Sequence, residues 1–354
     1  MSNFELVSPL IHAKMSKAKI GVLLLNLGTP DSPSTPDVRK YLREFLMDRR
    51  VIDIPFWKRF LLINLIIAPF RAPKSAKVYK ELWTEKGSPL KLYGYEIEKL
   101  LQQSLGNDYL VSLGMRYQSP NTTEALEEFK NKGLEKIIVI PLYPQYASAS
   151  TGSSLEEAMN IIKNWEIIPE LHFISEYSGN ELMIKTYAEI GRKYMNETTF
   201  DHYLFSYHGL PERQILKGSC NNNCKLGTCC NSFHQNNRHC YRAQCFNTSR
   251  ILAKELGLTE DDYTVSFQSR LGKTPWIKPY TDEKIKELSE KGKKRILCFS
   301  PSFVADCLET TIEIGEEYKE LFEQNGGQHW QLVESLNAHP QWIECLKEMV
   351  MKRV

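Results

Sequence analysis

Short apolar runs recur along the chain and alternate with longer amphipathic stretches. Most of the short runs are apolar at nearly every position, as in 137–143, rather than at every second position. Strands that are buried on both faces have this pattern, which is typical of a parallel sheet covered by helices. The pattern predicts strands at 19–25, 109–115, 137–143, 171–176, 202–206, 263–268, 295–300 and 330–333.

Between these runs, apolar residues recur every three or four positions, which is the spacing of one helix face. Helices are expected at 37–49, 90–104, 122–132, 155–164 and 180–195. Strands that alternate with helices indicate an α/β fold with parallel sheets.

The two halves of the chain resemble each other. The segment 136–141 is similar to 294–301, and 24–30 ends its strand with a Gly-x-Pro turn as 205–211 does. We therefore expect two similar four-stranded α/β domains that meet near residue 175, with one long mixed sheet as the alternative. The expected limits are 17–175, 176–335 and, for a C-terminal helix, 336–354. Ligands of such folds bind at the carboxyl ends of the strands, where the Gly-x-Pro turns lie.

Residues 52–70 form the most apolar stretch outside the predicted strands, with Lys58, Arg59 and Arg71 interrupting or flanking it. Composition alone favours a buried helix here. The alternative is an exposed apolar lip that touches a membrane or a large apolar ligand.

Composition and charge narrow the class of protein. The chain has 354 residues, of which 42% are apolar and 25% charged, as in an ordinary globular protein. Its 45 Lys and Arg against 43 Asp and Glu leave a net charge of +2, which gives no reason to expect nucleic acid as a partner. No apolar run has the length of a membrane span, and 1–19 lacks the apolar core of a secretory signal. We expect a cytoplasmic protein.

Cysteines are concentrated in one short segment. Six of the nine lie within 26 positions: Cys220, Cys224, Cys229, Cys230, Cys240 and Cys245. In a reducing compartment such a cluster indicates a metal site before it indicates disulfides. Four thiolates suit zinc or an iron–sulfur cluster, but the spacing lacks two Cys-x-x-Cys pairs and does not assign four of the six.

Two further features bear on chemistry. His208 stands between a predicted strand and Gly209, where an imidazole can bind a metal or take a proton; the alternative is a structural histidine that caps a turn. After the strand at 295–300, carboxylates recur at helical spacing: Asp306, Glu309, Glu313, Glu317 and Glu320. Such a ladder can hold a cation or carry protons, although a solvated acidic helix face has the same pattern.

Aromatic and polar residues gather near the ends of other predicted strands. They are Arg116, Tyr117, Tyr143, Tyr146, Gln268, Ser269 and Trp276. A pocket with aromatic walls and few polar groups suits a flat apolar ligand.

These segments together resemble the ferrochelatase family, whose members insert ferrous iron into a porphyrin. The matching stretches run in family order from about residue 19 to 340: 21–30, 87–90, 143–146, 151–154, 206–211, 267–269, 275–277 and 303–309. The resemblance implies a fold of two similar Rossmann-like, chelatase-type domains, each with a four-stranded parallel sheet flanked by helices.

The resemblance also implies substrates and roles. Protoporphyrin IX and ferrous iron are the expected substrates and protohaem the product, in the last step of haem biosynthesis. His208 matches the essential pocket histidine, which binds iron or accepts a pyrrole proton, and Glu309 matches the carboxylate that faces it. Asp306 and Glu313 match the acidic helix face of the catalytic site. The remaining matches are substrate-binding residues: Arg116, Tyr117, Tyr143, Tyr146, Gln268, Ser269 and Trp276. The stretch 52–70 matches a lip around the pocket mouth that rests on a membrane.

Some family members carry a [2Fe–2S] cluster in an internal segment, which corresponds to about 218–245 here. The resemblance therefore implies a cluster held by four of the six thiols. The preferred set is Cys224, one of the adjacent pair Cys229 and Cys230, Cys240 and Cys245. Cys307 stands where family members often have His, and no role is assigned to it.

Three alternatives remain at this point. A chelatase for coproporphyrin or another tetrapyrrole would share the architecture, but the apolar lip favours protoporphyrin. A haem- or iron–sulfur-binding redox sensor could use the same scaffold without catalysis. A zinc-dependent nucleic-acid module is disfavoured by the near-neutral charge. The oligomeric state does not follow from the sequence.

Overall fold

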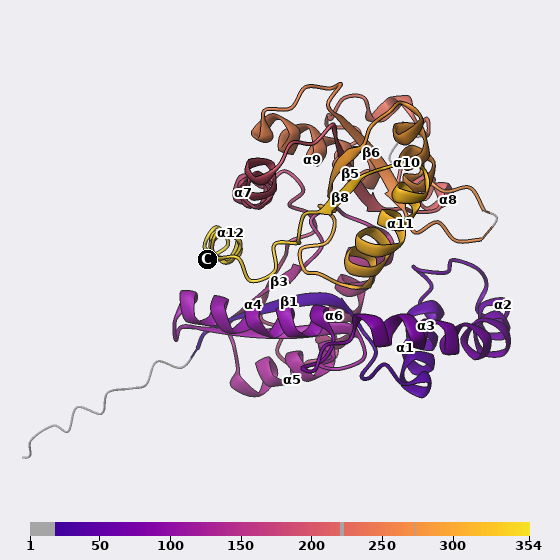
Figure 1. The fold of residues 1–354 in the computed structure, drawn as a ribbon. Helices are drawn as coiled ribbons and strands as arrows, with labels where there is room; N and C mark the ends of the chain where they lie inside the picture. Colours follow the sequence, from indigo (N-terminus) through magenta and orange to yellow (C-terminus); the bar gives the residue numbers. More distant parts are fainter. Residues whose placement is uncertain (1–17, 220–222, 273) are drawn as a thin grey trace, which may run out of the picture.

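Two parallel sheets of four strands each organise the chain (Figure 1). The computed structural model describes residues 18–219, 223–272 and 274–354. The first sheet has the order β2-β1-β3-β4 and the second β6-β5-β7-β8, with all strands parallel. Their bounds are β1 Ile20–Gly28, β2 Tyr109–Tyr117, β3 Lys136–Pro141, β4 Glu170–Phe173, β5 His202–His208, β6 Tyr263–Gln268, β7 Arg295–Phe299 and β8 His329–Leu332. The predicted α/β class and all eight strands are confirmed, and one long mixed sheet is excluded.

Helices flank both sheets. In the first half they are α1 Thr35–Met47, α2 Phe56–Leu61, α3 Ala68–Leu82, α4 Pro89–Leu105, α5 Thr122–Lys132 and α6 Ser153–Ile162, with π-helical turns η1 Leu62–Ile67 and η2 Ser148–Gly152. In the second half they are α7 Glu181–Glu197, α8 Glu212–Lys217, α9 Tyr241–Leu256, α10 Thr281–Glu290, α11 Tyr318–Gln324 and α12 Pro340–Met351, with η4 Thr228–Cys230 and the π-helix η5 Glu309–Glu317. The five predicted helices are confirmed to within two residues at each end.

Local sequence signals set the helix ends. The α5 helix begins at a capping box, in which the Asn121 side chain accepts from the Glu124 amide while the Glu124 carboxylate accepts from the Asn121 amide. It ends at Gly133 in the left-handed conformation, which glycine adopts without strain. These signals explain why the sequence located this helix to the residue.

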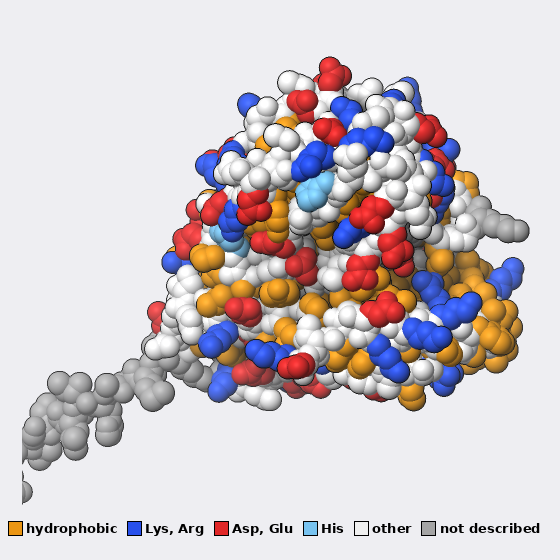
Figure 2. Space-filling view, in the orientation of Figure 1, with side chains coloured by type: hydrophobic (Ala, Val, Ile, Leu, Met, Phe, Trp, Pro, Cys, Tyr) orange, Lys and Arg blue, Asp and Glu red, His pale blue; other side chains and the backbone are white. Residues whose placement is uncertain are grey.

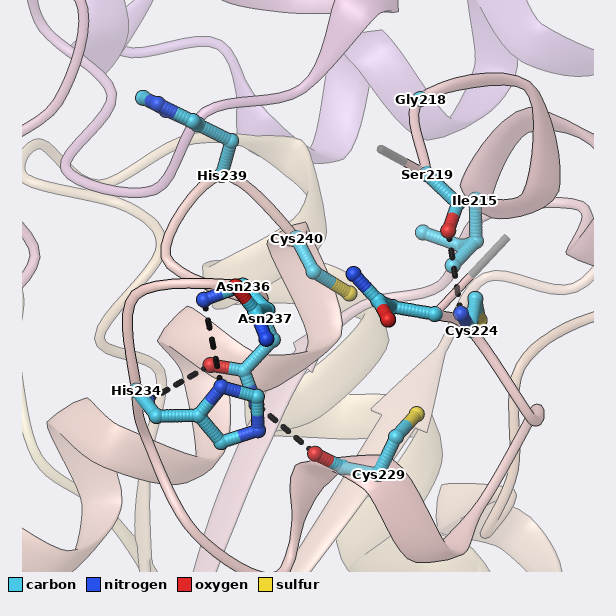
Figure 3. Close-up of a pocket in the computed structure, with 11 residues that line it drawn as sticks. Ile215, Gly218, Ser219, Cys224, Cys229, His234, Asn236, Asn237, His239 and Cys240 are labelled. Atoms are coloured by element: carbon cyan, nitrogen blue, oxygen red, sulfur yellow. Dashed lines mark hydrogen bonds between the residues drawn. The ribbon is translucent and has the colours of Figure 1, made fainter. Parts of the chain in front are cut away.

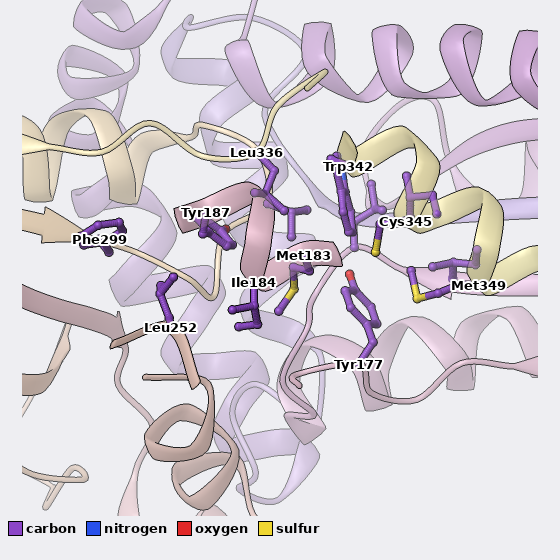
Figure 4. Close-up of a cluster of buried hydrophobic side chains, with 14 of the residues drawn as sticks. Tyr177, Met183, Ile184, Tyr187, Leu252, Phe299, Leu336, Trp342, Cys345 and Met349 are labelled. Atoms are coloured by element: carbon purple, nitrogen blue, oxygen red, sulfur yellow. The ribbon is translucent and has the colours of Figure 1, made fainter. Parts of the chain in front are cut away.

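One apolar core joins the two halves. Buried residues of β1 and β3 belong to the same cluster as those of β5 and β7. The α12 helix returns from the second half and packs against α4 and α7, and its Trp342 stacks on Tyr177 (Figure 4). The predicted boundary near residue 175 falls in the connection between β4 and α7 and stays a prediction.

The apolar stretch 52–70 is helical from Phe56 onward, but its outer face is exposed. Trp57 and Phe70 each expose 74% of their surface and Leu65 63%, whereas Ile63 is buried. The expectation of burial that rested on composition is therefore wrong. A helix at the edge of the molecule covers only the stripe that faces α1, so the apolar residues on its other side remain exposed. Among the residues that the structure describes, no helix is long and apolar enough to span a membrane.

Candidate functional site

The carboxyl end of the second sheet brings the predicted chemistry together. The last residue of β5, His208, pairs in register with Gln268 at the end of β6. Gly209 follows at a place where its amide donates to the Gln268 carbonyl (2.8 Å) and where an added Cβ would lie 2.7 Å from that oxygen. Glycine therefore lets β5 turn sharply enough to present His208 at the sheet edge.

His208 has one ring nitrogen committed and one available. Its Nδ1 lies 2.7 Å from the Gly209 carbonyl oxygen. A carbonyl only accepts, so Nδ1 carries the hydrogen and Nε2 presents its lone pair. The ring is flanked by Trp276 and Phe303, with centroids 6.5 Å away in each case. The imidazole is thus held between two aromatic side chains.

Glu313 lies close enough to His208 and Glu309 for their charges to interact. Its carboxylate accepts hydrogen bonds from the Ser269 amide (2.8 Å), the Ser269 hydroxyl and the Tyr318 hydroxyl (3.1 Å). Burial raises the pKa of Glu313, the charge of Glu309 adds to that shift, and Ser269 and His208 oppose it. His208 and Glu309 thus both lie near the Glu313 carboxylate.

Both glutamates lie on η5, which is π-helical over its whole length. Regular π-helical turns are rare and occur often at functional sites, because the wider turn redirects side chains. Helical spacing in the sequence correctly grouped these carboxylates, but it did not predict the wider turn.

Glu309 faces the first half of the molecule. Burial is the first cause that raises the pKa of Tyr79 and of Tyr41, and the charge of Glu309 raises both further. Tyr41 lies on α1 and Tyr79 on α3, and α3 contacts η5 directly. Two buried tyrosines of the first half thus lie near Glu309. Sequence reasoning missed them because neither belongs to a recognisable motif.

Asp306 occupies a different position from the two glutamates. Its Oδ1 accepts from the Ser335 amide (3.1 Å) and the Thr310 hydroxyl (3.3 Å), and its Oδ2 accepts from the Asn337 amide side chain (2.7 Å). The carboxylate is therefore used to join the start of η5 to the loop after β8.

The predicted wall residues of the second half lie around His208. Gln268 is buried, accepts from Ser206 (2.6 Å) and points its amide nitrogen at the Glu309 carbonyl (3.4 Å). The Trp276 indole donates to the Leu271 carbonyl (2.9 Å). Both side chains are thus held by neighbours rather than free to rotate.

The predicted wall residues of the first half are held in a polar network. Arg116 donates to Asp48 (2.9 Å) and to Ser153 (2.8 Å), and the Tyr117 hydroxyl also donates to Asp48 (2.9 Å). Burial works to raise the pKa of Asp48, but hydrogen bonds led by the one from Ser153 outweigh it and hold the pKa below its usual value. Asp48 was missed because nothing in the local sequence distinguishes it from a helix cap.

The two remaining wall residues are tyrosines of the 143–146 segment. The Tyr143 hydroxyl lies 3.5 Å from the Ser154 hydroxyl, and burial raises the Tyr143 pKa. The Tyr146 amide donates to the Gln244 side chain of α9 (2.7 Å), which fixes this segment against the second half.

A cavity of about 180 Å³ lies in the cysteine segment (Figure 3). Cys224, Cys229 and Cys240 line it, together with Ile215, Gly218, Ser219, Asn223, His234, Asn236, Asn237 and His239. The sulfur atoms of Cys229 and Cys240 point toward its middle, whereas the His239 side chain extends away. Over the described part of the chain, no three His, Cys, Asp or Glu side chains are arranged around a single metal ion.

The other cysteines of the segment lie in different places. The Cys230 sulfur is 3.9 Å from that of Cys229, and a hydrogen bond with Cys230 is the first cause that lowers the Cys240 pKa. Cys245 does not line the cavity: it is completely buried in the shared core, and burial raises its pKa. Cys220 lies outside the described residues.

Comparison with known proteins points in one direction. A model of the ferrochelatase family matches residues 19–354. A ferrochelatase of Legionella pneumophila (strain Paris) is 48% identical over 334 residues, which cover 94% of this chain and 99% of that protein. A ferrochelatase of Coxiella burnetii (strain Dugway 5J108-111) is 44% identical over 349 residues, which cover 97% of this chain and 96% of the relative.

A solved structure shares the fold at low sequence identity. SirB from Bacillus subtilis with Fe3+ superposes with a TM-score of 0.52 at 10% identity, over 94% of this chain and 95% of SirB. At that identity the likeness concerns the fold alone, and it agrees with the two-sheet architecture.

Proposed function

This chain belongs to the ferrochelatase family of metal chelatases, and we propose that His208, Glu309 and Glu313 carry its reaction, the insertion of ferrous iron into protoporphyrin IX to form protohaem. The observation that carries the assignment is the free Nε2 of His208, placed beside two carboxylates at the carboxyl end of a parallel sheet.

The chemistry of insertion needs a base and a metal donor. Ferrous iron replaces two pyrrole protons, so two protons must leave as the dication enters the ring. His208 Nε2 accepts one pyrrole proton, and the Glu309 carboxylate holds the incoming iron at the face of the porphyrin ring. The ionised Glu313 carboxylate accepts the second proton, because burial raises the pKa of this group and so its affinity for a proton.

Asp306 has a supporting role in this proposal. With three donors on its carboxylate, it holds the start of η5 in place and is a positioning residue for Glu309 rather than a metal ligand. The remaining roles follow the resemblance: Arg116, Tyr117, Tyr143, Tyr146, Gln268, Ser269 and Trp276 form the porphyrin walls.

The test is an anaerobic insertion assay that follows loss of protoporphyrin fluorescence on addition of ferrous iron. Turnover of protoporphyrin several times faster than of coproporphyrin supports the proposal, since two further carboxylates fit the apolar lip poorly. Faster turnover of coproporphyrin would instead identify the more polar coproporphyrin as the substrate. Porphyrin binding without insertion would favour the redox-sensor alternative.

We propose that the cysteine segment holds a [2Fe–2S] cluster. Three cysteines line one cavity and Cys230 adjoins two of them, so the described residues offer four sulfur donors of the kind that such clusters use. We propose Cys224, Cys229, Cys230 and Cys240 as ligands, with Cys229 and Cys230 on different irons. This replaces the preference for Cys245, whose sulfur lies in the core. A bound cluster would supply one-electron redox chemistry and order the segment.

Counting iron and acid-labile sulfide in anaerobically purified protein tests the cluster. Two of each per chain, lost in Cys229→Ser and Cys240→Ser but retained in Cys245→Ser, is the expected result. Loss in Cys245→Ser with an unchanged melting temperature would restore Cys245 as a ligand. Zinc in place of iron would indicate that the segment forms a structural zinc site instead of a cluster.

The exposed lip supports peripheral contact with the cytoplasmic face of a membrane. From 56 to 80 the chain has six Lys or Arg and no Asp or Glu. Figure 2 shows this apolar surface, with basic side chains beside it, at the end of the molecule that holds α2 and α3. Apolar side chains with flanking cations suit an interface with anionic lipid.

Sedimentation with vesicles tests this contact. Binding to phosphatidylglycerol vesicles that falls at least tenfold in the double variant Trp57→Ser, Phe70→Ser is expected. Exposed Ile167 of the connection before β4 is a matched control, because it is 84% exposed but lies outside the lip. Equal losses in Ile167→Ser and in the lip variant would contradict the proposal.

A further inference from the structure

The short helix α8 joins three regions of the molecule. It begins directly after the Gly209-Leu210-Pro211 turn that follows His208, and its last turn leads to Gly218 and Ser219 of the cysteine cavity. Its Glu212 amide donates to the Pro275 carbonyl (3.0 Å), next to the wall residue Trp276. The helix is therefore tied to the catalytic edge of the second sheet.

The opposite side of α8 holds a segment of the first half. Residues 50–54, here called the strap, lead from α1 into the lip helix α2. Arg213 binds the Asp53 carboxylate through Nε (2.7 Å), and Lys217 binds its other oxygen (3.0 Å). Gln214 donates to the carbonyls of Arg50 (3.3 Å) and Val51 (3.2 Å). Three side chains of α8 thus bind the strap, which lies more than 150 residues away in the sequence.

The strap is also fixed to the lip itself. Arg59 of α2, whose side chain is buried, donates to the carbonyls of Ile52 (3.0 Å) and Ile54 (2.9 Å). A displacement of the strap would therefore displace the first turn of the lip. Asp53 is the one charged group of the strap that contacts α8, and its carboxylate is only 12% exposed. The Asp53 carboxylate is shielded, whereas its partners Arg213 and Lys217 are 43% and 70% exposed.

We infer that Asp53, through Arg213 and Lys217, is a positioning residue that holds the lip at the working distance from the His208 edge. The inference rests on the proposed function, because it assigns the lip to the porphyrin entrance. Porphyrin enters past the lip whereas iron is held by groups on β5 and η5. Loss of the Asp53 contacts therefore weakens porphyrin binding and leaves iron binding and the chemical step nearly unchanged.

The experiment compares the steady-state constants of Asp53→Asn, Asp53→Ala and Lys217→Ala. We expect the KM for porphyrin to rise about tenfold in Asp53→Ala and about threefold in Lys217→Ala, with kcat and the KM for ferrous iron changed less than about twofold. Lys217 is 70% exposed, so its variant tests the contact without a folding risk. Glu135→Gln, which removes an exposed ion pair with Lys19, is the matched control and leaves all three constants unchanged.

A double-variant cycle identifies the partner. Asp53→Ala is combined first with Arg213→Ala and then, separately, with Lys217→Ala. If Asp53 acts through α8, neither double variant raises the porphyrin KM further than Asp53→Ala alone. Additive effects would overturn the inference, as would a lower melting temperature with an unchanged porphyrin KM, or a loss confined to kcat.

Direct porphyrin binding separates this inference from the proposed function. Quenching of protein fluorescence by metal-free protoporphyrin gives a Kd without any insertion step. A wild-type protein that binds porphyrin but inserts no iron would remove the proposed function, while the ratio of Kd between Asp53→Ala and wild type would still decide the role of Asp53.

Discussion

The two halves of the molecule have the same strand order but differ in the residue that precedes the glycine of the Gly-x-Pro turn. In each half the first strand lies inside the sheet and leads into a Gly-x-Pro turn. The glycine of this turn is Gly28, the last residue of β1, and Gly209, directly after β5. The residue before that glycine is Leu27 in the first half and His208 in the second. Leu27 packs against the apolar cluster of α1 and α3, whereas His208 stands beside Glu309 and Glu313.

This difference indicates that the two halves have different roles, one structural and one in the proposed reaction. The edge of the first sheet is filled by buried networks, such as that around Asp48, and by the base of the lip. The edge of the second sheet instead gathers His208, Glu309 and Glu313. Variants at matching places should therefore affect stability in the first half and catalysis in the second.

The largest expected effect is on catalysis at His208. His208→Ala removes the base and lowers kcat by about 10²-fold or more, while the melting temperature and porphyrin binding stay close to wild type. His172→Ala on β4 is the matched control, because that histidine lies in the first half and pairs only with Glu170. Stopped-flow fluorescence measures both variants. Near-wild-type turnover of His208→Ala would contradict the assignment.

The second effect concerns the two glycines. An added Cβ at Gly28 would lie 2.0 Å from the Tyr117 carbonyl oxygen, and Gly28 has a φ of +106°. Gly28→Ala should therefore cost about 3 kcal/mol of unfolding free energy, and Gly209→Ala, with its 2.7 Å approach and ordinary φ, about 2 kcal/mol. Urea unfolding measures both. A larger loss of stability in Gly209→Ala would reverse the comparison.

The third effect is on the buried network of the first half. Asp48→Asn should reduce the unfolding free energy by about 2 kcal/mol at pH 7, because Arg116 loses its charged acceptor. The pKa of Asp48 is lowered in the folded protein, so its stabilisation is present above the unfolded pKa and is lost as pH falls through the folded value. The stability difference between variant and wild type should accordingly narrow at acidic pH.

A partly exposed carboxylate provides the control for this third effect. Asp31, which pairs with Lys40 and Lys91 at the surface, should lose less than about 0.5 kcal/mol on replacement by Asn. A kcat for Asp48→Asn that falls as far as that of His208→Ala would show that the first half takes part in the chemistry.

The smallest effect is a pH dependence at Glu313. Burial raises its pKa in the folded state, so the protonated carboxyl is favoured and its contribution to stability is lost as pH rises through the folded pKa. Glu313→Gln cannot ionise, so its melting temperature relative to wild type should increase between pH 5 and pH 8. Paired thermal melts across this range measure the change. A relative melting temperature that is constant or falls would contradict the raised pKa.

The repeated pattern could be predicted because it is carried by near neighbours in the sequence. Continuous apolar runs such as β3 and β7 must be buried on both faces, and short-range caps such as Asn121 locate helix ends. The continuous apolar runs, alternating with helical stretches, were enough to predict both sheets. The position of His208 followed as well, because a residue between a buried strand and a glycine has only the sheet edge to occupy.

Other features were decided by residues far apart in the chain. The exposure of Trp57 depends on which helix face α1 covers, and the burial of Cys245 depends on the core beneath α9. The three donors to Asp306 come from residues as far as 31 positions away. Neither the apolar stretch nor the cysteine spacing carries this information.

The sequence by itself therefore determined the α/β class, the two halves, the family and the histidine that the second half presents. Only the tertiary structure decided which apolar residues form the lip, which cysteines share a cavity, and that Asp53 joins the lip to α8. The physical reason is range: strand burial and helix capping act within a few residues, whereas ion pairs, hydrogen bonds and core contacts form between any segments that the fold brings together.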